Sequence, residues 1–141
     1  MYRENGYKWV VVAGRDVSPA SLMNAVAHLS LSMASCCSGQ EAKQFHEYID
    51  GNGKMVSSIS NWPVIVLGAK NCNQLRMLRV RASEAGVPCQ AFVGEMIGGS
   101  ADEQLAKTSE TMGEELTYWA VMLFGHRNCV DPLIKRFSLF R

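Results

Sequence analysis

The sequence predicts a layered α/β domain whose sheet is covered by helices on both faces, and three observations support this prediction. Short runs rich in valine and other apolar residues recur along the 141 residues and are typical of buried strands. Segments with apolar residues at helical spacing lie between these runs. The resulting order is strand, helix, hairpin, strand, helix, strand, helix, strand, helix, which is typical of a sheet packed between helices. No linker, internal repeat or low-complexity segment interrupts this order, so residues 1–141 are predicted to form a single domain.

The first half of the chain predicts a central strand, a long helix and a hairpin. Residues 7–13 are apolar on both faces, as expected for a central strand. Ser18 is a good N-cap and Pro19 a good first helical residue, so a helix is expected from there to Gly39. Residues 43–59 flank the turn sequence Asp-Gly-Asn-Gly and predict an inserted β-hairpin.

The second half alternates between strands and helices. The predicted strands are residues 63–67, 88–93 and 118–124. Helices are predicted to begin at the caps Asn71, Ser100 and Asn128; the first ends at Gly86 and the last carries apolar side chains as far as Phe137.

The composition excludes two classes of protein. Charged residues make up only 19% of the chain and its net charge is +1, whereas a typical soluble domain carries about 25% charged residues. The apolar fraction of 48% is too high for a disordered chain. The small net charge argues against a general polyanion binder, whose affinity depends on excess Lys and Arg.

The shortage of charge is concentrated in the first helix. Residues 17–40 contain no Asp, Glu, Lys or Arg, although a surface helix normally carries charge on its outer side. Polar residues interrupt the segment too often for a membrane span, so no membrane association is expected. We expect something to cover this helix on a second side. A second subunit, which would make the protein a homodimer, and the inserted hairpin are both candidates.

Two further segments are charged with opposite sign. Residues 70–81 are basic and include Arg76 and Arg79, whereas residues 95–115 are mostly acidic. A solvated surface explains both segments. A local tRNA-facing patch is the alternative for the basic one.

The cysteines and the start of the chain predict a cytoplasmic protein without a metal or cofactor. The five cysteines form no Cys-x-x-Cys pair and lie far in sequence from the histidines, which does not favour zinc. The first residues have no apolar signal core. Adjacent Cys36 and Cys37 are best explained as small buried residues, with redox chemistry as the alternative. Glycine-rich nucleotide loops and the serine-hydrolase elbow are absent from the sequence.

Five residues are candidates for a functional site beyond the carboxyl ends of the strands, where open α/β sheets bind ligands. Arg15 and Asp16 follow the first strand, Glu95 follows the strand at 88–93, and Asn24 and His28 share a polar stripe of the first helix. If they converge, Arg15 and Asn24 would bind a small anionic substrate. Asp16, His28 and Glu95 would then be catalytic, orienting or deprotonating water.

Each catalytic candidate has a structural alternative. Asp16 could cap the first helix or pair with Arg15. His28 could be a hydrogen-bonded structural histidine, and Glu95 a loop carboxylate.

Several segments resemble type II peptidyl-tRNA hydrolases in sequence and order. They are Arg15-Asp16, Asn24-Ala-Val-Ala-His28, Pro63-Val-Ile-Val-Leu67 and the helix end at residues 82–88. Nearly the whole chain resembles the bacterial family known as domain of unknown function 2000, most closely at residues 24–29 and 92–96 and from 123 to the C-terminal Ser-Leu-Phe-Arg.

The resemblance implies a three-layer α/β/α sandwich on a mixed sheet. It also implies metal-independent hydrolysis of an ester such as peptidyl-tRNA, with His28 matching the helix histidine and Glu95 standing where those enzymes have an Asp. Residues 18–20 replace the Gly-Lys step that opens the first helix of those enzymes. The alternative function is a non-catalytic oligomeric domain that binds a small molecule or a protein partner.

Overall fold

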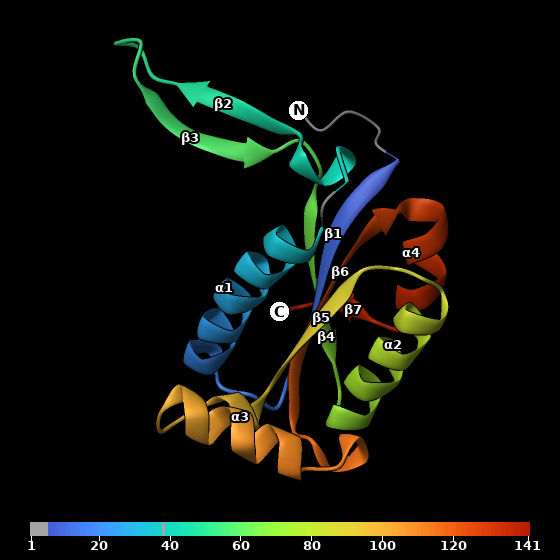
Figure 1. Ribbon diagram of the computed structural model, residues 1–141. Helices are drawn as coiled ribbons and strands as arrows, with labels where there is room; N and C mark the ends of the chain where they lie inside the picture. Colours follow the sequence, from blue (N-terminus) through green and yellow to red (C-terminus); the bar gives the residue numbers. More distant parts are fainter. Residues whose placement is uncertain (1–5, 38) are drawn as a thin grey trace.

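The computed structural model describes residues 6–37 and 39–141, and a five-stranded mixed sheet forms its centre (Figure 1). The strand order is β5-β6-β1-β4-β7. The strands are β1 (Tyr7–Gly14), β4 (Val64–Ala69), β5 (Cys89–Val93), β6 (Tyr118–His126) and β7 (Ser138–Leu139). Strand β1 runs parallel to β4 and antiparallel to β6, while β5 and β7 pair antiparallel with β6 and β4.

The centre of the sheet is the strand with the strongest apolar run. Val10, Val11 and Val12 of β1 are fully buried, because helices cover both faces of the strand. Val11 packs in a cluster with the first helix, and Val10 and Val12 pack in a second cluster on the opposite face. The prediction of a mixed α/β fold with a central first strand is confirmed.

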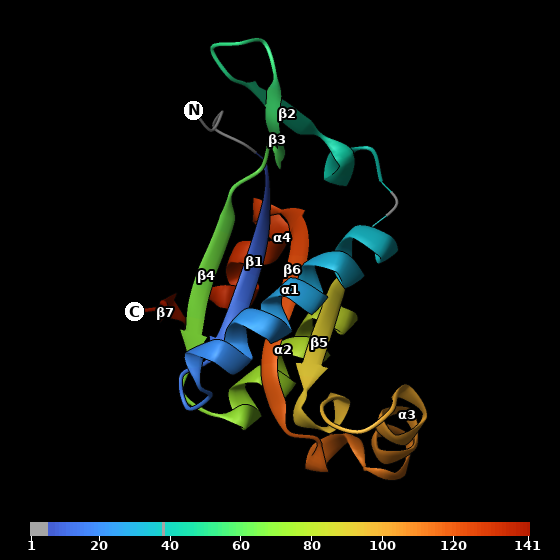
Figure 2. The same cartoon turned by 90° about the vertical axis from the view of Figure 1, so that its left-hand side faces the viewer.

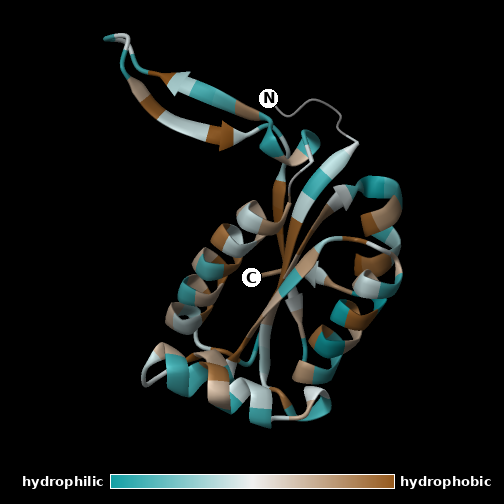
Figure 3. Ribbon diagram, in the orientation of Figure 1, coloured by the Kyte–Doolittle hydropathy of each residue, from teal (hydrophilic) through white to brown (hydrophobic). Residues whose placement is uncertain are grey.

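Helix α1 (Pro19–Cys36) covers one face of the sheet, and helices α2 (Cys72–Glu84) and α4 (Arg127–Ile134) cover the other (Figure 1). The brown stripes of these helices face the sheet in Figure 3, as amphipathic packing requires. Ser18 caps α1 by accepting a hydrogen bond from the Ser21 backbone N–H, and Asn71 does the same for α2 through Gln74. None of the helices in the described ranges is long and apolar enough to cross a membrane.

Helix α3 (Ala101–Glu110) lies at one end of the sheet, beyond the end of β5 (Figure 2). It is capped by Ser100, as the sequence predicts, and none of its residues is buried. Gly98 and Gly99 have positive φ angles of 81° and 68°, and this left-handed turn, which favours glycine, redirects the chain into α3. Short 3-10 turns η2 (Gly94–Met96) and η3 (Gly113–Glu115) flank the segment.

The predicted hairpin is confirmed as β2 (Phe45–Ile49) and β3 (Met55–Ser60), which follow the 3-10 turn η1 (Glu41–Lys43). The Asp50 carboxylate accepts backbone hydrogen bonds from Asn52 and Lys54 across the turn. Every residue of β2 is exposed, and the hairpin extends away from the sheet (Figures 1 and 2). The expectation that the hairpin covers α1 is therefore wrong.

Helix boundaries near the C-terminus differ from the prediction. The cap of α4 is His126, whose Nδ1 accepts from the Asn128 backbone N–H at 3.1 Å, so Asn128 is not the cap. The helix ends at Ile134 instead of continuing to Phe137, and the two-residue strand β7 follows. Helix α1 likewise ends at Cys36, three residues before Gly39.

Candidate functional site

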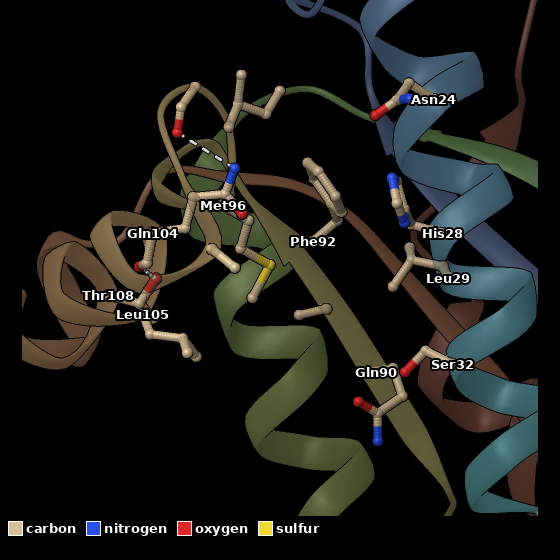
Figure 4. A pocket seen from close by; sticks show the side chains of 14 residues that line it. Asn24, His28, Leu29, Ser32, Gln90, Phe92, Met96, Gln104, Leu105 and Thr108 are labelled. Carbon is tan, nitrogen blue, oxygen red and sulfur yellow. Dashed lines mark hydrogen bonds between the residues drawn. The ribbon is translucent and has the colours of Figure 1, made fainter.

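A pocket of about 720 Å³ opens between α1 and α3, with β5 as its floor (Figure 4). It is lined by residues 24, 28, 29 and 32 of α1, 90–92 of β5, 96–98 of the following turn, and 101, 104, 105 and 108 of α3. The volume lies within the range of about 300–1,000 Å³ that is typical of small-molecule sites. This pocket is therefore the first candidate for a ligand-binding site.

One wall of the pocket is polar. Asn24, His28 and Ser32 are four residues apart on α1, so the helical repeat places them on one side of the helix. Figure 4 shows Asn24 and His28 on the side of α1 that faces Phe92. This wall presents an amide, an imidazole and a hydroxyl, each of which can donate or accept a hydrogen bond.

The floor and the opposite wall are mainly apolar. Phe92 comes from β5, Met96 and Ile97 from the turn after it, and Leu105 from α3. Leu105 is 69% exposed, so the wall formed by α3 remains open to solvent. Gln104 holds α3 against this turn, because its side-chain amide donates to the Gly98 carbonyl at 3.2 Å.

Among residues 6–37 and 39–141, no Asp, Glu, Lys or Arg lines this pocket. Nor do the described residues contain any group of three or more His, Cys, Asp or Glu side chains placed to hold a metal ion. The pocket itself offers hydrogen bonding from α1 and mainly apolar contact from the floor and the α3 wall, where Gln90, Gln104 and Thr108 add further polar groups.

His28 is exposed and stacks on Phe92, with the ring centroids 5.8 Å apart and an interplanar angle of 25°. Within residues 6–37 and 39–141 its ring makes no hydrogen bond to another side chain or to the backbone. Both ring nitrogens are therefore free to meet a ligand. The alternative of a hydrogen-bonded structural histidine does not match these contacts.

Glu95 lies behind this pocket and not in its lining. Its carboxylate is buried and accepts hydrogen bonds from the Thr117 backbone N–H at 3.1 Å and the Thr117 hydroxyl at 3.0 Å. Burial raises the pKa of Glu95, but hydrogen bonds from Thr117 and from the backbone N–H of Glu95 itself, together with the charge of Lys107, lower it by more in sum, and the net pKa lies below its ordinary value. The carboxylate ties the turn after β5 to the start of β6.

Arg15 lies at the opposite edge of the sheet. Its guanidinium donates to the Ser138 hydroxyl at 2.9 Å and the Leu139 carbonyl at 3.0 Å, and it sits 5.6 Å from the centre of the Phe140 ring. These contacts hold the C-terminal strand β7 against the loop after β1. The Arg15 side chain is therefore engaged in contacts within the protein.

Asp16 is exposed in the turn between β1 and α1 and does not line the α1–α3 pocket. Neither an ion pair nor a side-chain hydrogen bond of Asp16 occurs among the residues that the structure describes. The helix cap is Ser18, so Asp16 serves neither as the cap nor as a partner for Arg15.

The structure thus brings together Asn24 and His28 in one pocket and places Arg15, Asp16 and Glu95 outside its lining. The basic residues Arg76 and Arg79 lie on α2, which covers the other face of the sheet (Figure 1). Arg79 donates to the Tyr118 hydroxyl at 2.9 Å, and Arg76 donates to the Glu114 carbonyl at 3.1 Å. Neither arginine flanks the pocket of His28.

The wall of the pocket opposite α1 was not predicted from the sequence. Its members come from three separate segments, and none carries a catalytic group that would single it out. One signal was present: residues 101, 104, 105 and 108 share one side of α3 although that helix has no buried residue. A helix without buried residues is expected at the rim of a ligand site and not over the hydrophobic core.

Comparison with known proteins places the chain in a family. A search of curated proteins found no match. Among solved structures, a protein of unknown function from Agrobacterium, Atu0240, is similar in fold with a TM-score of 0.81 at 21% sequence identity. The similarity covers 97% of this chain and 99% of that one. Residues 7–141 match the family described as protein of unknown function DUF2000, as the sequence resemblance predicts, and the chain therefore belongs to this family.

Proposed function

We propose that this protein binds a small, uncharged molecule in the pocket between α1 and α3. The observation that carries this proposal is the pocket's lining: a polar stripe of Asn24, His28 and Ser32 faces mainly apolar side chains, and none of the described residues that line it is charged. Such a combination of apolar surface with a few convergent polar groups is typical of small-molecule sites.

The lining also indicates the chemistry of the ligand. An aromatic or branched aliphatic part would lie against Phe92, Met96 and Leu105. A carbonyl, amide or hydroxyl group would point to α1, where Asn24 and His28 offer hydrogen bonds one helical turn apart. Burying an ion here would leave its charge uncompensated, and this disfavours an anionic ligand.

The test is a fragment screen by ligand-observed NMR on the full chain and on two histidine variants. We expect neutral amphipathic fragments to bind the wild type and to lose roughly tenfold in affinity with His28→Ala, since one lost hydrogen bond and stacking contact correspond to about 1.4 kcal/mol. The matched control is His46→Ala, an exposed histidine of the hairpin, which should bind as the wild type does. Equal binding by all three proteins would contradict the proposal.

A second candidate function is hydrolysis of an ester, with the ligand of this pocket as the substrate. The observation that favours it is His28, whose ring nitrogens are free of hydrogen bonds within the described part of the chain and face the pocket next to Asn24. An imidazole in this position can accept a proton from water as the water attacks a bound ester. Asn24 would hold the ester carbonyl through its amide N–H.

Peptidyl-tRNA is the specific substrate that the resemblance to type II peptidyl-tRNA hydrolases suggests. Its support is the shared position of His28 and the placement of α1 on one face of the sheet with α2 and α4 on the other, as in a three-layer α/β/α sandwich. The assay compares cleavage of peptidyl-tRNA and of small neutral esters by the wild type and by the Asp16→Ala/His28→Ala double variant. Cleavage no faster than that of the double variant would remove both substrates.

A further inference from the structure

The β2–β3 hairpin carries a large apolar surface into solvent. Its six large hydrophobic side chains are each 48–68% exposed: Phe45, Tyr48, Ile49, Met55, Val56 and Ile59. Strand alternation and the pairing of Ile49 with Met55 place Phe45, Ile49 and Met55 on one face of the hairpin, with Glu47 between the first two, and Tyr48 and Ile59 on the other face. An isolated two-stranded hairpin is only marginally stable, and exposed apolar patches of this size mark interaction sites.

The root of the hairpin is fixed to the body of the protein. The Trp9 indole N–H donates to the Ser60 hydroxyl at 3.0 Å, and the Trp9 backbone N–H donates to the Pro63 carbonyl at 2.9 Å. Trp9 is itself buried in the core beside α1. These bonds set the direction in which the hairpin leaves the sheet, so it forms a projecting arm.

A second apolar surface lies on the body of the same chain. Met23 and Leu31, on the outer side of α1, are 71% and 72% exposed. Met23 also lines a groove of about 440 Å³ between α1 and the β4–β7 edge of the sheet, together with Val26, Val66 and Phe140. None of the residues in the described part of the chain that line this groove is charged, and α1 itself contains no charged residue.

The groove exists because α1 lies off-centre on the sheet. The helix packs mainly on β6 and β5, which leaves the residues of β4 on that face uncovered (Figure 2). Val64 and Val66 consequently remain 54% and 40% exposed. The folded chain thus presents an apolar arm and a charge-free apolar groove, and neither is covered by the protein itself.

We propose that the groove between α1 and β4 receives the β2–β3 hairpin of a second copy of this chain, with the two copies exchanging hairpins reciprocally. A second copy is the occupant because the chain supplies both surfaces, and two-fold symmetry lets each copy cover the other's groove. The absence of charge from all of α1 fits a surface that is permanently covered, since the core of a homodimer interface is depleted of charged residues.

The available area supports reciprocal exchange. Only one face of a hairpin can enter a groove, and the face with Phe45, Ile49 and Met55 carries three side chains that are 52–57% exposed. Since a whole aromatic side chain buries about 150–250 Å², three half-exposed side chains offer about 300 Å². Two such hairpin faces and the groove surfaces that they cover would together bury about 1,200 Å², the lower end of the roughly 1,200–2,000 Å² of a standard specific interface. A single hairpin in a single groove would bury about half of that area.

The experiment is sedimentation equilibrium on the full chain over a range of protein concentrations. We expect the wild type to be a dimer, and two variants, Ile49→Lys/Val56→Lys on the hairpin and Met23→Glu in the groove, to be monomers. The matched control is Met112→Lys, which adds a charge at another hydrophobic residue that is 62% exposed but lies outside both surfaces. This control should remain a dimer. Because every substituted side chain is largely exposed, circular dichroism should show all variants folded.

Mixing the two monomeric variants separates reciprocal exchange from other arrangements. The hairpin variant keeps its groove and the groove variant keeps its hairpin, so the mixture should form a heterodimer with one intact contact, weaker than the wild-type dimer. A wild type that is monomeric at all concentrations would overturn the proposal. So would a dimer that survives either variant, or a mixture that stays monomeric.

Discussion

Glu95 illustrates how a single buried carboxylate joins two segments of the chain. Its hydrogen bonds from Thr117 and from its own backbone N–H, together with the charge of Lys107, favour the charged form and in sum outweigh the effect of burial, so its pKa in the folded state lies below that in the unfolded chain. A carboxylate of this kind stabilises the fold above its unfolded-state pKa, and this contribution is lost as the pH falls through its folded-state pKa. Its role in the described structure is to fix the turn that carries Met96 and Ile97 into the pocket.

Glu95→Gln tests this role. The amide keeps the shape of the side chain but loses the charge, so we expect the free energy of unfolding to fall by about 1–2 kcal/mol at neutral pH. Denaturant unfolding of both proteins measures the difference. The difference in the free energy of unfolding should become smaller at acidic pH, because the wild-type carboxylate becomes protonated. A difference that stays constant between neutral and acidic pH would show that charge plays no part.

The buried thiol of Cys37 is expected to react slowly with alkylating reagents. Burial and, to a smaller extent, neighbouring Cys36 together raise the pKa of the Cys37 thiol to about 11. The thiolate is the nucleophilic form, so Cys37 should react slowly with iodoacetamide at neutral pH. Cys37 is buried as the sequence predicts, but the same prediction for Cys36 is wrong because its side chain is exposed. Mass spectrometry of the folded protein should therefore find the exposed Cys36 and Cys129 alkylated first, and Cys37 only after denaturation. Early labelling of Cys37 would contradict its burial.

At the scale of elements, the short strand β7 depends on Arg15. Beyond its ladder with β4, it is held by the guanidinium, which donates to Ser138 and Leu139 and lies by the Phe140 ring. The guanidinium itself occupies the space where a Cβ on Gly68 would stand. Glycine is therefore required at this position of β4 for Arg15 to reach β7.

We expect Arg15→Ala and Gly68→Ala each to destabilise the protein by about 1–2 kcal/mol, because both remove the hydrogen bonds of the guanidinium to β7. The double variant should cost little more than either single one, since the same contact is lost in all three. Hydrogen exchange at Phe140, whose N–H donates to the Val66 carbonyl, measures the release of β7 directly. Additive effects of the two substitutions would contradict the coupling.

Elements were predictable from the sequence where their signals are local. The caps Ser18, Asn71 and Ser100 and the hairpin turn at Asp50 each act within a few residues, and all stand where the sequence predicts. Strand β7 was missed because two residues carry no alternating pattern and are defined by pairing with β4 and by Arg15. The direction of the hairpin could not be predicted either, because bonds between distant segments set it.

The candidate site was predictable only in part for the same physical reason. The four-residue spacing of Asn24 and His28 is enough to place them on one side of a helix. Whether Arg15 and Glu95 join them depends on where α1 lies across the sheet, which is a property of the whole molecule. The helix lies toward β5 and β6, so one flank forms the α1–α3 pocket and the other forms the apolar groove.

At the scale of the whole molecule, we propose that the α1–α3 pocket is the ligand site. The most direct measurement is crystallographic fragment screening of the wild-type protein with neutral amphipathic compounds. We expect bound fragments to cluster in this pocket, with an apolar part against Phe92 and a polar atom within hydrogen-bond distance of Asn24 or His28. Fragments that bind elsewhere on the protein and leave this pocket empty would contradict it.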